Sequence, residues 1–340
     1  MSDVAYLKEL NKNIKIYFST TIFSIGFVFN TMTILVFLRK GLYNNKTNMS
    51  LLYICLAIFD TLALFDSILF IQLFPAINLN IQQMSDFLCK FTKLWHRTTL
   101  QAPSWILCII SFDRYRTVCL PPNKLAFMKS KRNILIIILS INLILFLINS
   151  LHWAFYIERK YTLTKIFDVD LNKTINQSVL SSSACNPSSP IVQALSDNIN
   201  SVMRAYVPFI IIFILNILLV KQFIQSKRKM QHSKMNSNNS STTENSSSMS
   251  RREIYFTFSV ISLNILFLIL YTPWTIFVTF KSIFNSVNPN PTPLTNYIIL
   301  IVEQVVISIA FLMNTSSFVF NFFFNKLFIY EIMRILKLKK

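Results

Sequence analysis

The chain has 340 residues, of which 53% are hydrophobic and 14% are charged, whereas a soluble domain usually carries about 25% charged residues. It has only two glycines, Gly26 and Gly41, which argues against the glycine-rich loops that hold nucleotide phosphates. The net charge of +19 would suit nucleic-acid binding, but the basic residues lie between long apolar runs and do not line one face of a domain.

Seven apolar runs are long enough to cross a membrane as helices, because roughly 20 apolar residues span the hydrocarbon core. The third run is the least apolar, with Lys93 and Arg97 inside it, so we expect it to lie within the bundle, away from lipid. The sequence therefore predicts an all-α fold, a seven-transmembrane helix bundle. The predicted spans are residues 16–38, 49–74, 86–119, 132–157, 198–224, 252–280 and 294–323.

The segments outside these spans are polar. Residues 1–15 have mixed charge and are expected to form an extracellular N-terminus without a cleavable signal peptide. Residues 225–250 are rich in Ser and Asn and are expected to form a flexible cytoplasmic loop. The tail, residues 325–340, is predicted to be a short amphipathic eighth helix on the inner membrane face. Most Lys and Arg residues lie on the side of the C-terminus, so the positive-inside rule predicts an extracellular N-terminus and a cytoplasmic C-terminus.

A long outer loop is expected between the fourth and fifth spans, at residues 158–196. It carries two glycosylation sequons, which begin at Asn172 and Asn176. Sequons are common by chance in an Asn-rich chain, and others begin at Asn45 and Asn239. The predicted position of the loop outside the cell favours glycosylation at the first pair.

A set of residues in a fixed order suggests a particular family. Asp113, Arg114 and Tyr115 end the third predicted span on its cytoplasmic side. A lone tripeptide is weak, and a solvated helix end would explain it as well. Its context is stronger, because a cysteine, a buried aspartate after Leu-Ala, prolines in the fifth and sixth spans, and an aromatic residue four positions before Tyr271 follow the same order. The whole set resembles the rhodopsin-like (class A) G-protein-coupled receptors, over about residues 30–328.

The resemblance implies a disulfide bond between Cys89, at the outer end of the third span, and Cys185 in the outer loop. An oxidising extracellular side would permit this bond, and the alternative is two free thiols. The other cysteines, Cys55, Cys108 and Cys119, fall within spans or at the inner face.

The resemblance also implies a switch at the inner mouth of the bundle, made of Asp113, Arg114, Tyr115 and Glu253. An arginine in hydrocarbon is expensive unless it is paired or hydrated, so we expect Arg114 to contact Asp113 and Glu253 in a closed state. A core of further switch residues is expected in the middle of the bundle: Asn30, Asp60, Phe267, Tyr271, Pro273, Pro208, Asn314 and Ser317.

Several positions depart from the family pattern. Asn216 stands where the family has a fifth-span tyrosine, and the seventh-span motif lacks its proline and tyrosine, with Ser317 and Asn321 near those positions. Pro103 replaces a small polar residue, which weakens the expectation of a sodium site at Asp60. These changes indicate a divergent member and leave open a receptor that no longer signals.

The ligand site is expected among the outer ends of the third, fifth, sixth and seventh spans. His96 occupies the position of the aspartate that pairs amine ligands, and no lysine lies in the seventh apolar run, so neither a monoamine nor retinal is favoured. Mixed charge with aromatic residues favours a peptide, and an acidic or amidated peptide that meets Arg97 and Arg204 is our expectation. Bundle packing is an equally good role for each candidate alone: His96, Arg97, Gln101, Arg204, Trp274 and Glu303.

Two other classes of protein are alternatives, an enzyme and a secondary transporter. An enzyme would need convergent catalytic groups, but His96, His152 and His232 fall in separate regions, so no catalytic, metal or cofactor site is predicted. A secondary transporter would show an internal repeat, and the sequence has none. The sequence therefore predicts a plasma-membrane receptor whose partners are an extracellular ligand and a heterotrimeric G protein, and no nucleic acid.

Overall fold

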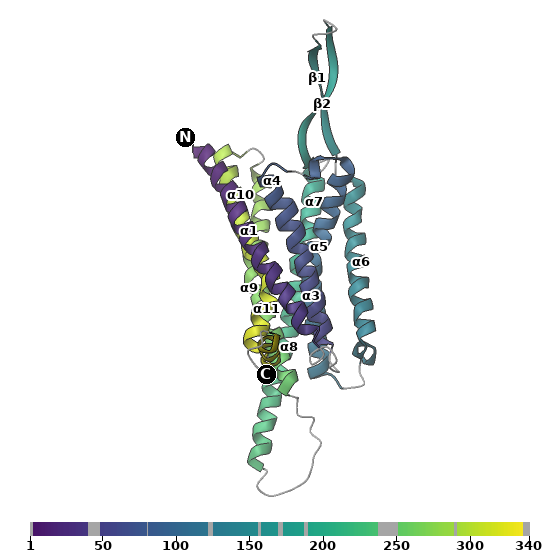
Figure 1. The fold of residues 1–340 in the computed structure, drawn as a ribbon, viewed down its shortest axis with the longest axis vertical. Helices are drawn as coiled ribbons and strands as arrows, with labels where there is room; N and C mark the ends of the chain where they lie inside the picture. Colours follow the sequence, from purple (N-terminus) through teal and green to yellow (C-terminus); the bar gives the residue numbers. More distant parts are fainter. Residues whose placement is uncertain are drawn as a thin grey trace.

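The computed structural model describes residues 3–39, 48–79, 81–121, 125–155, 158–168, 173–186, 190–236, 251–288 and 291–335. Within these residues, seven helical rods run side by side as a bundle, so the predicted fold class is confirmed (Figure 1). The two chain termini lie toward opposite ends of the bundle. The rods are α1 (Asp3–Phe37); α3 (Met49–Leu64) with η1 (Phe65–Leu73) and α4 (Phe74–Ala76); α5 (Asp86–Cys119); α6 (Lys131–Phe155); α7 (Pro190–Ser201) with η4 (Val202–Tyr206) and α8 (Val207–Asn236); α9 (Arg251–Val287); and α10 (Pro293–Phe311) with α11 (Met313–Phe324).

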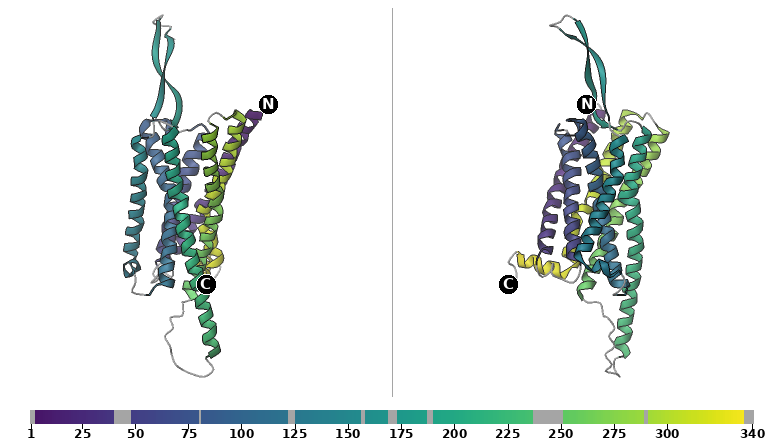
Figure 2. Two further views of the ribbon diagram at one scale, coloured as in Figure 1. Left: turned by 180° about the vertical axis from the view of Figure 1, so that it is seen from behind. Right: turned by 90° about the vertical axis from the view of Figure 1, so that its right-hand side faces the viewer.

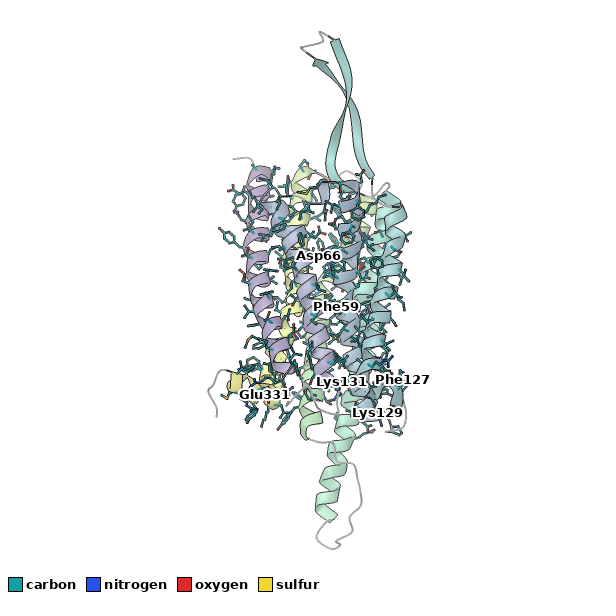
Figure 3. The ribbon with its side chains drawn as sticks, turned by 45° about the vertical axis from the view of Figure 1, so that its right-hand side comes forward. Phe59, Asp66, Phe127, Lys129, Lys131 and Glu331 are labelled. Carbon is teal, nitrogen blue, oxygen red and sulfur yellow. A yellow bond between two sulfur atoms is a disulfide. The ribbon has the colours of Figure 1, made fainter. Side chains whose placement is uncertain are left out.

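The rods differ in how apolar they are, and therefore in how readily each could contact lipid. Six helices among the described residues are long and apolar enough to cross a membrane, and α5 is the rod that does not qualify. It instead packs against α3, α6, α8 and α9, as the sequence predicted for its third span. Leu135, Leu139 and Leu143 of α6 are exposed, which fits contact with lipid. Figure 3 shows side chains standing outward from the rods around the bundle.

Two helices extend past the predicted spans. Helix α1 begins at Asp3, so most of the segment predicted as a polar extracellular N-terminus is helical. Helix α8 continues to Asn236, so part of the segment predicted as a flexible loop is also helical. Lys, Leu and Glu residues precede the apolar run of α1, and Lys, Gln and Met residues follow that of α8, and all of these residue types favour helix. Helix α12 (Lys326–Ile335) lies across the end of the bundle, as Figure 2 shows, and Arg39 contacts its Glu331 at 3.5 Å.

The outer loop is more ordered than the sequence suggested. Strands β1 (Glu158–Asp168) and β2 (Lys173–Asn186) pair antiparallel, and the hairpin stands away from the end of the bundle opposite α12 (Figure 1). The bundle itself is all-α, and the outer loop adds this two-stranded hairpin to it. The sequence does carry a signal for these strands. Segments such as Tyr161–Leu163 are rich in β-branched and aromatic residues, which favour strand over helix.

One close approach of helices depends on the absence of a side chain. A Cβ atom on Gly26 of α1 would collide with Leu64 of α3 and would lie 2.9 Å from the Cγ2 atom of Thr315 in α11. Glycine therefore lets three rods meet in the middle of the bundle, beside the polar core described below.

Candidate functional site

Arg114 lies at the end of α5 that faces α12 and is 1% exposed. Its Nη2 atom donates to Asp113 Oδ2 at 2.8 Å, and Arg116 Nη2 donates to Asp113 Oδ1 at 2.9 Å. The Asp113 carboxylate thus holds both arginines, which partly offsets the cost of burying the charge of Arg114. Glu253 lies in the first turn of α9, but its side chain is outside the described part of the structure, so its contact with Arg114 stays a prediction. Tyr115 is only partly buried, and its ring centroid lies 6.4 Å from that of Phe112.

Ser111 lies three residues before Arg114 in α5, and it meets the fully buried side-chain amide of Asn264, which joins three helices. Asn264 Nδ2 on α9 donates to Ser111 Oγ on α5 and to Asn216 Oδ1 on α8, both at 2.9 Å. Ser111 Oγ in turn donates to Asn264 Oδ1 at 3.1 Å. Asn216, which replaces the family's tyrosine, therefore contacts α9 directly. We call Ser111, Asn216 and Asn264 the amide bridge.

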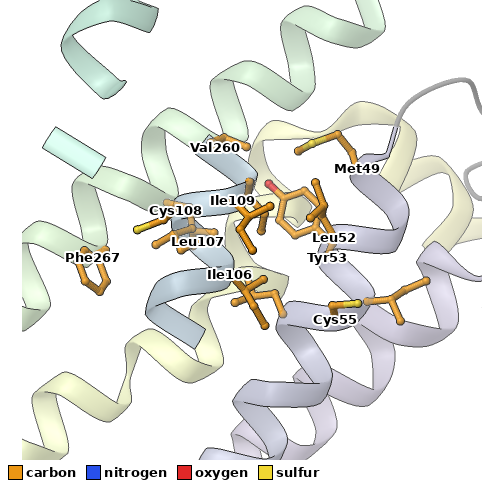
Figure 4. Close-up of a cluster of buried hydrophobic side chains, with 14 of the residues drawn as sticks. Met49, Leu52, Tyr53, Cys55, Ile106, Leu107, Cys108, Ile109, Val260 and Phe267 are labelled. Atoms are coloured by element: carbon orange, nitrogen blue, oxygen red, sulfur yellow. The ribbon is translucent and has the colours of Figure 1, made fainter. Parts of the chain in front are cut away.

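A second contact joins α9 to the other side of the bundle. The Tyr53 hydroxyl on α3 lies 3.3 Å from Ser259 Oγ on α9, which donates to Asn321 Oδ1 on α11 at 3.2 Å. Figure 4 shows the Tyr53 hydroxyl directed toward the helix that carries Val260. We call Tyr53, Ser259 and Asn321 the hydroxyl bridge. Asn321 occupies the position of the missing seventh-span tyrosine, and here too an asparagine contacts α9.

The predicted polar core is assembled in the middle of the bundle. Asn314 Nδ2 donates to Asp60 Oδ1 at 2.9 Å, and Asn30 Nδ2 donates to the Asn314 carbonyl at 3.0 Å. Beside Asp60 is a cavity of about 10 Å³, lined also by Pro103 and Ser317. Ser317 Oγ, Asn314 Oδ1 and Ser104 Oγ are buried there without a partner among the described residues. The space suits about one water molecule, which these polar atoms could bind.

Aromatic side chains of α9 form a column above this core. The ring centroids of Phe267 and Tyr271 are 4.6 Å apart, and those of Tyr271 and Trp274 are 6.5 Å apart. Pro273 lies inside α9 between them, where it removes one backbone hydrogen bond. Pro208 lies in α8, and its carbonyl accepts from the Cys108 thiol at 3.9 Å. The predicted residues Phe267, Tyr271 and Pro273 thus lie together, while Pro208 lies on a separate helix.

Arg204 is the ligand candidate whose surroundings are least expected. It lies in the π-helical segment η4, is 3% exposed, and has no hydrogen bond from Nε or Nη2 to a described residue. Its guanidinium carbon lies 4.7 Å from the ring centroid of Trp274, 5.5 Å from Tyr271 and 5.8 Å from Phe311.

The other predicted ligand residues face separate partners. His96 Nδ1 lies 2.7 Å from Asp66 Oδ2, and Gln101 bonds with Asn149 of α6 at 2.8 Å. Arg97 pairs with Asp197 at 3.3 Å, and Glu303 pairs with Lys281 at 2.7 Å. Of the six candidates, the structure brings only Arg204 and Trp274 into direct contact among the described residues.

The outer loop is fixed to the bundle by a covalent bond. Cys89 at the start of α5 and Cys185 near the end of β2 form a disulfide, with a Cα–Cα distance of 5.7 Å. Of the two glycosylation candidates, Asn172 lies outside the described residues, and Asn176 lies in β2 with a side chain that is not described. Glycosylation stays a prediction.

Several of these contacts were not anticipated from the sequence. Tyr53, Ser111, Ser259 and Asn264 were not singled out, although each is a polar residue in an apolar run and such residues usually pair inside a membrane. That general signal could have selected them. It could not have given their partners, because the pairs are far apart in the chain.

A bundle of apolar helices with a buried arginine at one end and a disulfide-anchored loop at the other is the architecture of a seven-helix membrane receptor. The sequence model of the 7 transmembrane receptor (rhodopsin family) matches residues 29–314. The chain therefore belongs to the rhodopsin family of seven-transmembrane receptors and is a multi-pass membrane protein of the plasma membrane. No curated protein sequence matches it.

Proposed function

We propose that this receptor converts the binding of an extracellular, peptide-like ligand into activation of a heterotrimeric G protein, and that it does so by moving the inner end of α9 outward. The inner end is the one that carries Arg114 and α12. The proposed orientation, N-terminus outside, rests on the Lys and Arg residues near that end and on the two sequons in the segment between α6 and α7.

The observation that carries the proposal is the attachment of α9 on both of its sides. The amide bridge ties α9 to α5 and α8, and the hydroxyl bridge ties it to α3 and α11. Movement of α9 must break both bridges and uncover Arg114. Each buried hydrogen bond contributes about 0.5–1.5 kcal/mol net, so a ligand with moderately higher affinity for the open state could shift the equilibrium.

The departures from the family pattern fit this proposal. Where other members have tyrosines, Asn216 and Asn321 accept hydrogen bonds from α9 in the closed arrangement. Loss of the tyrosines therefore does not leave the inner half without contacts. It replaces them with amides that favour the closed state.

The test is the variant Asn264→Leu, which keeps the side-chain size and removes the amide bridge. We expect ligand-independent G-protein activation in cells to rise about tenfold, because the closed state alone loses its hydrogen bonds. Adding Arg114→Ala should return activation to background. The matched control is Asn142→Leu on α6, whose amide bonds to the carbonyl of Ile138 in its own helix and to no other helix among the described residues.

The outcomes separate the candidates. If Asn264→Leu signals no more than Asn142→Leu at equal surface expression, α9 is not restrained in this way. If no variant activates any class of G protein, the alternative of a receptor that reaches the membrane without signalling is favoured. Glu253→Ala tests the remaining predicted contact of Arg114 and should also raise basal activation.

A further inference from the structure

Arg204 differs from the buried Arg114 and from the partly buried Arg97 in its lack of an acid partner among the described residues. Arg114 contacts Asp113, and Arg97 contacts Asp197, whereas Arg204 forms no ion pair with a described residue. Its Nε and Nη2 atoms, which form one edge of the guanidinium fork, are buried and unpartnered. The nearest rings are those of Trp274, Tyr271 and Phe311, and within the part of the chain that the structure describes no acid pairs with the guanidinium.

An isolated cation in such a place is costly. Taking a charged group out of water costs several kcal/mol, and a desolvated cation–π contact returns only about 2 kcal/mol. The short π-helical segment η4 places Arg204 there, and such segments occur frequently at functional sites. A purely structural role would be filled better by an apolar residue of similar length.

We propose that the ligand presents a carboxylate to Arg204, carried next to an aromatic or other apolar group that packs on Trp274. This inference rests on the proposed receptor function and names the chemistry of its ligand. Carboxylate oxygens match the guanidinium fork in a bidentate arrangement, and an aromatic neighbour matches the rings of Trp274, Tyr271 and Phe311.

The same geometry disfavours an amidated ligand. An amide has one acceptor oxygen and adds N–H donors, and a guanidinium offers donors only. The sequence proposed that Arg97 and Arg204 both meet the ligand, and their surroundings show which of the two is available for its acid group. Arg97 already has the carboxylate of Asp197, so the acid of the ligand goes to Arg204.

The probes are phenylacetate, hydrocinnamate, indolepropionate and a phenylalanine-terminated tripeptide, each compared with its primary amide. The full-length receptor is purified in nanodiscs, and its melting temperature is followed with a thiol-reactive dye, since Cys55 and Cys108 are buried free thiols that react on unfolding. We expect at least one acid to raise the melting temperature by about 2 °C more than its amide at millimolar concentration.

Arg204→Met should abolish the difference between acid and amide and weaken binding of the best acid about 30-fold or more. The same variant without ligand should melt at the wild-type temperature or above it, because an unpaired buried charge is removed. Lys8→Met, which removes a cation from an exposed position on α1, should keep the full acid effect. If Arg204→Met cannot be purified, Arg204→Lys decides, and the acid effect should fall at least by half.

The proposal is overturned if every acid and its amide act alike on the wild type, if Arg204→Met or, in its place, Arg204→Lys keeps the full acid effect, or if ligand-free Arg204→Met melts below the wild type. These results would leave the receptor function intact, because that function is tested by basal signalling of Asn264→Leu without any ligand. If Asn264→Leu shows no increase in basal signalling, the binding of acids to the purified receptor can still be measured by its melting temperature.

Discussion

The buried polar and charged side chains have different partners in the inner and outer halves of the bundle. In the inner half, Asn264 and Ser259 each form hydrogen bonds to two other helices, and Arg114 contacts Asp113. In the outer half, Arg204 is buried against aromatic rings and pairs with no acid among the residues that the structure describes. The buried arginine of the inner half therefore has an acid partner, although its Nε and Nη1 atoms find no hydrogen-bond partner among the described residues. The buried arginine of the outer half has no acid partner among them, and its charge is left for a ligand to satisfy.

This difference is informative about a two-state receptor. Hydrogen bonds that exist only in the closed arrangement favour that arrangement without any ligand. A buried charge without a partner, by contrast, makes the ligand-free state less stable than it would otherwise be. On the proposed function, a ligand that pairs with Arg204 would bind the open state more tightly, and that difference in affinity would offset the loss of the two bridges farther inside.

The largest expected effect comes from separating the outer loop from the bundle. Cys185→Ser removes the disulfide with Cys89, which closes a loop of 96 residues, and we expect a loss of about 4–5 kcal/mol. Surface expression should fall by more than tenfold, measured by labelling of intact cells. Cys119→Ser at the inner end, where the thiol is free, is the control and should be expressed like the wild type. Equal expression of both variants would mean that the outer half does not depend on this bond.

The sequence predicted the bundle because apolar runs of spanning length are a strong local signal. Helix α5 begins at Asp86, where the side chain of Ser85 caps it by accepting from the amide of Leu88. The π-helical segments η1 and η4 carry no comparable signal, because they differ from α-helix by a shift in hydrogen bonding that composition does not record.

The candidate site was only partly predictable for a similar reason. Asp60, Asn30 and Asn314 were expected together, and the structure brings them together, because the resemblance to a family supplied their register. The amide bridge depends on residues up to 153 positions apart, and a single sequence does not give the rotation of one helix against another. Arg204 could be named as a candidate, but its lack of an acid partner is a property of the packed bundle.

An intermediate effect is expected from Tyr53→Phe in the inner half. The change removes one hydroxyl from the hydroxyl bridge and keeps the ring, which stacks on Phe37 with centroids 5.0 Å apart. One lost hydrogen bond of about 1 kcal/mol should raise basal G-protein activation about two- to fivefold. A dose–response of receptor expression against second-messenger level measures it. The comparison variant is Tyr255→Phe, also on the inner side, which should leave activation unchanged. Lower basal activation in Tyr53→Phe would show that the bridge belongs to the open state.

The smallest effect should come from the rim of the outer half, where Lys281 of α9 pairs with Glu303 of α10 at 2.7 Å. Both side chains are about one-third exposed or less, 33% and 27%, so the pair is partly solvated and should contribute at most about 1 kcal/mol. Lys281→Glu should lower the melting temperature of the purified receptor by about 2–4 °C, because it places two acids together. The exchange Lys281→Glu with Glu303→Lys should restore most of that loss, and added salt should shrink both differences. A larger and salt-independent loss would mean that the rim is as tightly organised as the inner half, and the contrast between the two halves would then have to be confined to Arg204.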